Sequence, residues 1–414
     1  MSKTQTLEHK EGYEKNKLGW TPEGWTVMSL GKIGEFSKGK GVAKKDIQEN
    51  DVEGLPSIRY AEIYTLYDYY TYSLETKINE ESARNSNPIN YGDILFAGSG
   101  ETLEDIGKSV AYLGNETAYA GGDIIILKQN CQDSQYLGYL LNNDVVRNQL
   151  FKLGQGHSVV HIYSSGLKKV LIPLPPLPEQ QKIAQILVTW DKAIALQEQL
   201  IAEKQALKKG LMQRLLTGKK RFPGFEEEWE VVKLEDVCDF KNGKGHEKSI
   251  DPTGQYVVVN SKFISTDGSV RKYTKKQASP LFKNNIVMVM SDVPNGKALA
   301  KCYLIDEDNR YSLNQRICSL TSININTKFL YYQLNRNKFY LKFNDGLSQT
   351  NLKKKEVLGC PIVVPQMEEQ EKIVSVIEAS GESLKLMQEA VKDMIQQKQG
   401  LMQQLLTGEK RVKI

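Results

Sequence analysis

The sequence predicts an α+β protein: two mixed α/β domains separated by two long helices that pack on each other, within an internal repeat. The clearest sign of the repeat is Gly-Leu-Met-Gln-x-Leu-Leu-Thr-Gly, which ends at Gly218 and again at Gly408. The shift that carries Gly218 onto Gly408 is called the repeat offset below. A second observation is an apolar heptad pattern upstream of each copy. The third is that the blocks outside these patterns hold short apolar runs bounded by Gly, Asp and Asn, as strands do.

The first block, about 1–172, predicts strands at 93–96 and 122–127 and a short helix at 136–141. It contains six tyrosines between Tyr60 and Tyr72. Tyrosine suits both strand packing and a loop lining a groove, so the pattern leaves both interpretations open.

The first long helix is predicted over 179–217, because prolines up to Pro178 oppose an earlier start and Gly218 suits a helix end. Apolar residues recur there in alternating steps of three and four, interrupted by Gln197, Lys204 and Lys208. Two ordinary helices, each packed on its own domain, are the alternative interpretation. The predicted seam of the first helix is Ile183, Leu187, Trp190, Ile194, Ile201, Leu211 and Leu215.

The second block, about 222–364, repeats features of the first. Trp229-Glu-Val-Val-Lys-Leu234 resembles Trp25-Thr-Val-Met-Ser-Leu30, and a strand at 285–290 and a helix at 329–334 are expected. A second long helix follows Pro365 and has polar seam positions at Ser380 and Lys398. Its apolar seam is Ile373, Ile377, Leu384, Met387, Val391, Met394, Leu401 and Leu405.

Composition is that of an ordinary globular protein, with 40% hydrophobic and 25% charged residues and a net charge of +5. The mild excess of basic residues permits nucleic-acid binding through local patches. Five cysteines form no Cys-x-x-Cys pair, and no apolar run approaches the length of a membrane span. No secretory leader is visible at the N-terminus, so a cytoplasmic location is expected.

Catalytic motifs are weak. Phe96-Ala-Gly98-Ser-Gly100 fits a pattern of S-adenosylmethionine-binding methyltransferases, but its repeat counterpart lacks the glycines, so a turn is the favoured interpretation. His157 and His161 are four apart without the neighbouring Glu of a zinc protease, and a metal site is not expected.

Basic residues recur at matching positions of the two blocks, as expected for phosphate contacts, and polar residues beside them are candidates for reading base edges. A solvated lysine face is the alternative for any single cluster. The candidates in block one are Lys38, Lys40, Lys44, Lys45, Gly156, His157, Ser158, Lys168 and Lys169. Those in block two are Lys241, Lys244, Lys248, Ser348, Gln349, Thr350, Lys353 and Lys354.

Over about 20–414 the chain resembles the specificity subunit of type I DNA restriction–modification systems. The resemblance rests on the Ile-Pro-Leu-Pro-Pro-Leu-Pro-Glu-Gln-Gln-Lys-Ile run ending at Ile183, its looser echo ending at Ile373, the two helix ends and the Trp-led blocks. It implies an antiparallel coiled coil, a pseudo-two-fold arrangement and four parts: target recognition domain 1 (1–174), conserved spacer helix 1 (175–221), target recognition domain 2 (222–364) and conserved spacer helix 2 (365–414).

The resemblance also implies a non-catalytic, DNA-binding subunit that reads a bipartite, asymmetric site in double-stranded DNA, one half-site per domain. Two modification subunits, with restriction subunits in the larger complex, would be the partners, and no membrane is involved. The chain itself would bind no cofactor, because S-adenosylmethionine, ATP and Mg belong to those partners. A stand-alone adenine DNA methyltransferase and a coiled-coil adaptor that binds only proteins are the competing hypotheses.

Overall fold

The computed structural model describes residues 10–42, 47, 54–156, 160–294 and 296–414. They form two compact units, which we describe separately. Unit 1 comprises residues up to Glu198 together with Glu389–Ile414, and unit 2 comprises Gln199–Gln388. Each unit therefore contains one recognition-type domain and a part of both long helices, so the compact units do not follow the four-part division by sequence, which stays a prediction.

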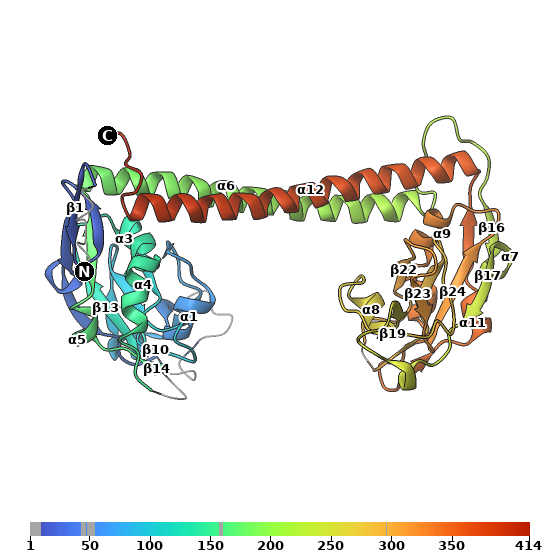
Figure 1. Ribbon diagram of the computed structural model, residues 1–414, viewed down its shortest axis with the longest axis horizontal. Coiled ribbons are helices and arrows are strands. Elements are labelled where there is room, and N and C mark those ends of the chain that lie inside the picture. Colours follow the sequence, from blue (N-terminus) through green and yellow to red (C-terminus); the bar gives the residue numbers. More distant parts are fainter. Residues whose placement is uncertain (1–9, 43–46, 48–53, 157–159, 295) are drawn as a thin grey trace, which may run out of the picture. The chain divides into compact units, whose positions relative to one another are not determined.

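Unit 1 is built on two sheets and three two-stranded ribbons (Figure 1, blue to green). The larger sheet has the order β4 (Glu35–Lys38), β13 (Ile124–Lys128), β9 (Ile94–Ala97), β11 (Ser109–Tyr112), β6 (Tyr70–Thr71). The smaller has the order β7 (Thr76–Ile78), β5 (Leu55–Ile58), β12 (Ala118–Ala120), β8 (Asn87–Ile89). The ribbons are β1 (Tyr13–Asn16) with β2 (Gly19–Pro22), β3 (Thr26–Ser29) with β15 (Leu171–Leu174), and β10 (Ser99–Gly100) with β14 (Val160–His161).

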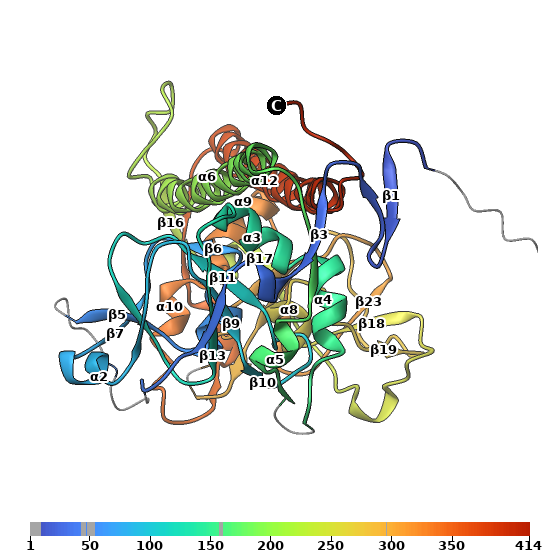
Figure 2. The same cartoon turned by 90° about the vertical axis from the view of Figure 1, so that its left-hand side faces the viewer.

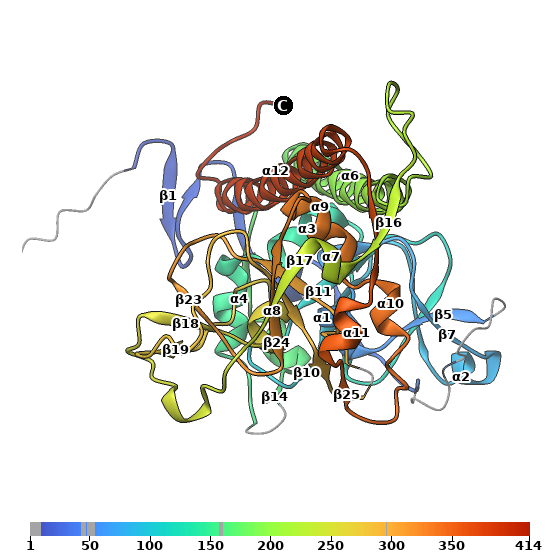
Figure 3. The same cartoon turned by 90° about the vertical axis from the view of Figure 1, so that its right-hand side faces the viewer.

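Unit 2 repeats this arrangement with fewer strands (Figure 3). Its larger sheet has the order β17 (Cys238–Asn242), β24 (Ile317–Ser322), β20 (Ile286–Val289), β22 (Cys302–Leu304), and its smaller sheet β19 (Tyr273–Thr274), β18 (Tyr256–Val259), β23 (Tyr311–Leu313). Its ribbons are β16 (Glu230–Lys233) with β26 (Pro361–Val364), and β21 (Ser291–Asp292) with β25 (Thr350–Asn351). The predicted apolar runs all lie in central strands, where both faces are buried.

Short helices flank these sheets in both units. In unit 1 they are α1 (Tyr60–Thr65), α2 (Glu80–Arg84), α3 (Ser134–Leu141), α4 (Asp144–Phe151) and α5 (Ser164–Leu167). In unit 2 they are α7 (Leu234–Val237), α8 (Ser261–Ser265), α9 (Thr327–Leu334), α10 (Lys338–Leu341) and α11 (Lys354–Leu358). The tyrosine-rich segment is mainly α1 and strand β6. Tyr70 lies in β6, and Tyr69 and Tyr70 both contact Tyr139 of α3, so the strand-packing interpretation holds for these two.

The two long helices are α6 (Leu177–Leu215) and α12 (Met367–Leu406). α6 begins two residues before the predicted start, so Pro178 lies inside it; proline is tolerated in a first turn, where its missing N–H has no intrahelical partner. All the predicted apolar seam residues are buried or half-buried, whereas Lys204 is exposed. None of the helices in the described part of the chain is long and apolar enough to cross a membrane.

The two helices run antiparallel within each unit. In unit 1, Glu179 of α6 is ion-paired with Arg411, and Asp191 of α6 is ion-paired with Lys398 of α12. A residue later in α6 therefore pairs with a residue earlier in the C-terminal segment. Unit 2 shows the same order. There Arg221, just after α6, pairs with Glu369, and Lys208 lies against Gly381. The pairs of the two units correspond through the repeat offset, so each unit builds the same helix contact from equivalent residues of the repeat.

Each domain shares its hydrophobic core with the helices that belong to its unit. In unit 1, Ile183 and Leu187 of α6 and Leu405 of α12 join the core formed by the large sheet and α3, which lies beneath the helices (Figure 2). In unit 2, Leu215 and Ile377 join the core around α9. Burying these apolar faces gives each helix part a fixed place on its own domain.

Each of these cores contains a buried glutamate that accepts hydrogen bonds from a tryptophan and an arginine. We call this group of three residues the Trp–Glu–Arg clasp. Glu179, 0% exposed, accepts hydrogen bonds from Trp25 Nε1 at 3.2 Å and from Arg411 Nε and Nη2 at 2.6 and 2.7 Å. In unit 2, Glu369 accepts from Trp229 Nε1 at 2.9 Å and from Arg221 at 3.1 and 2.8 Å. These hydrogen bonds raise the pKa of both arginines. The tryptophan that begins each Trp-led segment and the glutamate in the first turn of each long helix are thus parts of one contact.

Candidate nucleic-acid interface

Two short ribbons occupy equivalent positions in the two units. The ribbon β10–β14 pairs Ser99 with His161, and β21–β25 pairs Ser291 with Asn351, so His161 and Asn351 correspond through the repeat offset. Within its unit each ribbon lies at the end away from the long helices, as the labels β10 and β14 in Figure 1 and β25 in Figure 3 show. That end of each domain is free to meet a ligand without involving the helices.

The ribbon of unit 1 borders a small pocket of about 170 Å³. His161 accepts from or donates to Ser99 Oγ at 2.9 Å, and Lys38 and Tyr163 also line the pocket. Lys38 is held by Asp123, with 3.5 Å between Nζ and Oδ1, and Tyr163 is 56% exposed. Ser37 Oγ is buried at the same place and has no hydrogen-bond partner within the described residues. The pocket thus offers donors, acceptors, a cation and an aromatic ring.

The ribbon of unit 2 carries a different set of side chains. Gln349 Nε2 donates to Ser291 Oγ at 2.8 Å, while Asn351 is exposed and Thr350 is buried. Lys354 lies on α11, with its Nζ 5.5 Å from the ring centroid of Phe240. Asn351 takes the place of His161 here and Lys353 that of Tyr163, so the two ribbons present unlike hydrogen-bonding patterns on like frames.

The basic residues of unit 2 include a second group, on the segment that follows β17. Lys244 and Lys248 are exposed on either side of His246, which is 1% exposed. His246 Nε2 is 2.7 Å from Ser312 Oγ and its Nδ1 is 2.7 Å from the carbonyl oxygen of Lys244. The buried imidazole therefore anchors a segment whose lysines are exposed to solvent. Lys241 is also exposed, and its Nζ donates to the carbonyl oxygen of Pro280.

The structure brings together only some of the predicted contact residues. Lys38 lies at the unit 1 pocket, and Gln349 and Thr350 lie at the unit 2 ribbon, with exposed Ser348 beside them. Lys40, Gly156 and Lys353 are exposed near these elements, whereas Lys168 and Lys169 do not line the pocket. Lys168 lies by the turn of Gly31, whose N–H donates to its carbonyl oxygen. Lys44, Lys45, His157 and Ser158 lie outside the described residues.

Four residues with a place at these ribbons were missed as contact residues: Ser99, His161, Tyr163 and Asn351. The repeat offset aligns His161 with Asn351 and was a usable signal. The pairing of β10 with β14 could not be predicted from the sequence, because the two strands are far apart in the chain, with much of the domain between them. As a group, the predicted contact residues stay a prediction.

The glycine-bearing run at Phe96–Gly100 has a packing explanation. A Cβ on Gly98 would lie 2.7 Å from the carbonyl oxygen of Asp123, and one on Gly100 would lie 2.7 Å from Asp105 Cβ. Both glycines are therefore needed for close approach of neighbouring segments. In the described part of the chain, no three His, Cys, Asp or Glu side chains gather as a metal site requires.

Comparison with known proteins gives this duplicated architecture a class. A family profile described as "Type I restriction modification DNA specificity domain" matches residues 22–204 and 226–397, one match for each repeat. Among solved structures, the chain is similar to one described under complex assembly and conformational transition of the type I R-M system, with a TM-score of 0.64, 18% identity and coverage of 94% of this chain and 99% of the other. The HsdS subunit from Thermoanaerobacter tengcongensis gives a TM-score of 0.56 at 17% identity, covering 94% and 98% of the two chains.

Curated relatives agree with that class. The chain is 26% identical over 421 residues, 95% of this chain and 94% of the relative, to the type I restriction enzyme MjaVIII specificity subunit of Methanocaldococcus jannaschii. It is 25% identical over 173 residues to the type I restriction enzyme EcoKI specificity subunit of Escherichia coli strain K12, 41% of this chain and 37% of the relative. The protein belongs to the type I restriction–modification DNA specificity family, as its sequence resemblance indicated.

Proposed function

We propose that this chain reads a bipartite, asymmetric DNA site for a type I restriction–modification complex, with each recognition domain contacting one half-site. The chain performs no catalysis itself. Its ribbons and their neighbouring lysines contact the DNA, while modification and restriction subunits supply methylation, ATP-driven translocation and cleavage. S-adenosylmethionine, ATP and Mg are bound by those partners.

The observation that supports this proposal most is the contrast between frame and surface. Both units keep a large sheet of the same kind, the same ribbon position and the same Trp–Glu–Arg clasp. At the ribbons, however, His161 and Tyr163 of unit 1 correspond through the repeat offset to Asn351 and Lys353 of unit 2. A protein that reads two unlike half-sites needs a constant frame and unlike base-contacting side chains.

The long helices have two roles in this proposal. They determine the gap between the half-sites, and they hold two modification subunits. Several large apolar side chains of α6 and α12 are solvent-exposed, including Leu196 at 66%, Leu207 at 72% and Leu386 at 57%. Exposed apolar positions on a helix pair suit protein docking.

Methylome sequencing tests the proposal directly. A host without other methylation is given this chain and its modification subunit, and methylated adenines or cytosines are mapped. A single interrupted motif with two unlike halves is expected. Methylation by the purified chain alone would instead support a stand-alone methyltransferase, and stable partner binding with no DNA binding would support a protein-only adaptor.

Changing the ribbon of one unit is expected to change one half of the motif. Gln349→Ala and Asn351→Ala remove amides that pair well with base edges, so discrimination should fall about 10- to 100-fold at the half-site of unit 2. His161→Ala should act on the other half only. Methylome sequencing of each variant measures the effect, and a change in both halves, or in neither, would contradict this assignment.

Replacing the lysines around His246 is expected to weaken DNA binding without changing the motif. Lys244→Gln together with Lys248→Gln removes two phosphate contacts, so the slope of log K against log salt should become shallower by about 2. Fluorescence anisotropy of the assembled complex on its site, at several salt concentrations, provides the measurement. Lys283→Gln, on another exposed loop of unit 2, is the control. An unchanged slope in the double variant would remove these lysines from the interface.

A further inference from the structure

The starting point is a charged contact between helix and domain in unit 1. The carboxylate of Asp191 on α6 is ion-paired with Lys398 of α12 and accepts a hydrogen bond from the hydroxyl of Tyr139 on α3. Lys398 is only 7% exposed, and its Nζ lies 4.4 Å from the ring centroid of Tyr69 and 5.5 Å from that of Tyr139. Half-buried Trp190 fills the neighbouring seam position. A carboxylate, an ammonium group and aromatic rings thus contact one another in this part of unit 1.

Unit 2 contains a copy of this contact without its carboxylate. Through the repeat offset, Lys208 corresponds to Lys398, while Gly381 stands for Asp191 and Ser380 for Trp190. Lys208 lies directly over Gly381, because a Cβ there would be 2.9 Å from its Nζ. Within the described residues no carboxylate is ion-paired with Lys208. The cation of the contact is kept, and both the acid and the large ring are missing.

The hydroxyl of the contact is kept as well. α3 and α9 are equivalent helices: Gln180 Oε1 accepts from the backbone N–H that precedes α3, at Asp133, and Gln370 Oε1 accepts from the one that precedes α9, at Asn326. Tyr332 follows Asn326 by the same number of residues as Tyr139 follows Asp133, so Tyr332 is the counterpart of Tyr139. Tyr332 and Lys208 line the same pocket. The lysine and the tyrosine of the unit 1 contact are therefore both present in unit 2, and of these three polar groups only the position of the aspartate carboxylate is unfilled.

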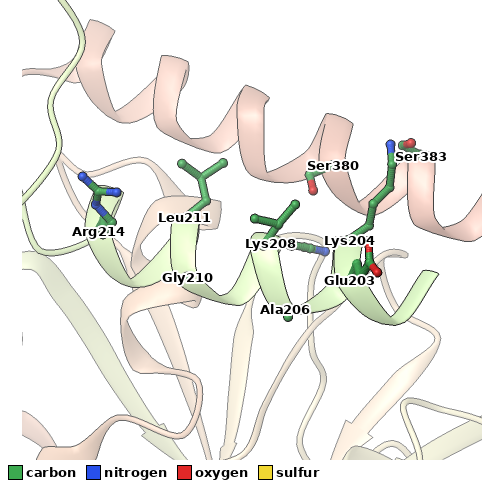
Figure 4. Close-up of a pocket in the computed structure, with 10 residues that line it drawn as sticks. Glu203, Lys204, Ala206, Lys208, Gly210, Leu211, Arg214, Ser380 and Ser383 are labelled. Atoms are coloured by element: carbon green, nitrogen blue, oxygen red, sulfur yellow. The ribbon is translucent and has the colours of Figure 1, made fainter. Parts of the chain in front are cut away.

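The missing side chains leave two adjoining hollows that share Lys208, with volumes of about 890 and 800 Å³. Figure 4 shows the first, between α6 and α12, with Lys204 extending toward Ser383. The second is lined by Lys208, Lys209, Arg336 and Lys338, and by no Asp or Glu of the described chain. Leu207, 72% exposed at the rim, stands where unit 1 has Gln397. The first is lined by Lys204, Lys208 and Arg214 and by one carboxylate, that of Glu203. The whole hollow, which we call the Lys208 groove, therefore carries more basic than acidic groups and has an apolar rim.

We propose that the Lys208 groove binds an acidic side chain, with a bulky apolar neighbour, from the modification subunit of the proposed complex. The bound carboxylate takes the position of Asp191, between Lys208 and Tyr332, and the apolar side chain takes that of Trp190. Unit 1 cannot bind the same segment, since its own side chains occupy the site. The proposal rests on the proposed function for the identity of the partner, and it makes the two partner sites of this chain unlike.

A nucleic-acid phosphate is the other anion to consider, and the structure favours the carboxylate. The filled copy in unit 1 shows which acid this set of groups accommodates. Apolar side chains such as Met212, Leu216 and Leu384 form much of the remaining wall, which suits a protein segment better than a hydrated sugar–phosphate backbone. Looser packing with no ligand at all is the remaining alternative, and the experiment separates it.

The experiment fills the groove from within the full-length chain. Ser380→Trp with Gly381→Asp restores the unit 1 residues, and Lys208→Met removes the cation while keeping much of the side-chain volume. With the modification subunit, native mass spectrometry should show two partners bound to the wild-type chain and one to either variant. Isothermal titration should show that the partner site of unit 2 is at least tenfold weaker in each variant than in the wild-type chain. Lys398→Met is the matched control: it should lower the unfolding temperature of unit 1 and leave both partner sites intact.

The result that overturns the proposal is retention of two partners, at unchanged affinity, by both groove variants with native-like circular dichroism. The groove would then be loose packing, and the proposed function would stand. If the variants keep both partners but lose DNA affinity, the occupant is a phosphate and the proposal is wrong. If even the wild-type chain retains no modification subunit, the proposed function itself fails together with this inference.

Discussion

Replacing Glu179 with Ala is expected to lower the free energy of unfolding of unit 1 by about 2–4 kcal/mol. Glu179 is fully buried and accepts three hydrogen bonds, two of them from a guanidinium group in bidentate geometry. Its removal leaves the indole N–H of Trp25 without its acceptor, and an unsatisfied buried donor carries a desolvation penalty. The truncation also leaves a cavity beside the core that α6 shares with the domain.

Urea unfolding followed by tryptophan fluorescence measures this loss, since Trp25 itself is in the clasp. Glu80→Ala is a matched control. Glu80 pairs with Arg84 at 3.2 Å, but both side chains are 79% exposed, so the expected change is about 0.5 kcal/mol or less. Glu369→Ala should destabilise unit 2 in the same way. A Glu179→Ala variant no less stable than the control would show that the clasp contributes nothing.

Removing one heptad from each long helix is expected to abolish methylation of the original site and to create a site with a shorter gap. Deleting residues 194–200 of α6 with 390–396 of α12 shortens each helix by about 10 Å, at about 1.5 Å per residue. Since B-DNA rises about 3.4 Å per base pair, the gap should shorten by about 3 base pairs. Deleting 194–200 alone should already change or abolish recognition.

The control for this deletion removes four residues from each helix. A heptad deletion keeps the remaining seam residues in register, whereas a four-residue deletion shifts them around the helix and disturbs the coiled coil. Methylome sequencing compares the two variants with the wild-type chain. An unchanged motif with an unchanged gap after the heptad deletion would refute the role of the helices as a spacer.

The repeat and both long helices could be predicted from the sequence because these features depend on local periodicity. Equal spacing of the two copies made the helix ends visible at Gly218 and Gly408, and the Trp-led echo coincides with two equivalent strands, β3 and β16. The prolines up to Pro178 predict a later helix start than the one observed, because the first turn of a helix accepts proline.

The clasps and ribbons depend on long-range contacts that no periodicity encodes. Trp25, Glu179 and Arg411 all lie in or near repeated motifs, yet their contact joins three distant parts of the chain. The heptad pattern predicts Lys208 and Ser380, the neighbour of Gly381, as polar seam positions. Their relation depends on the antiparallel register, which places Lys208 on Gly381, and on the comparison with the filled copy in unit 1.

The composition of unit 1 has a consequence for synthesis on the ribosome. Unit 2 is one continuous stretch, Gln199–Gln388, and can fold once it has emerged. Unit 1 needs Glu389–Ile414 for its core and for the arginine of its clasp, so the domain translated first is finished last. At about 5–20 residues per second, the interval is roughly 10–40 s, during which the apolar surface of nascent α6 that unit 1 buries stays exposed to solvent.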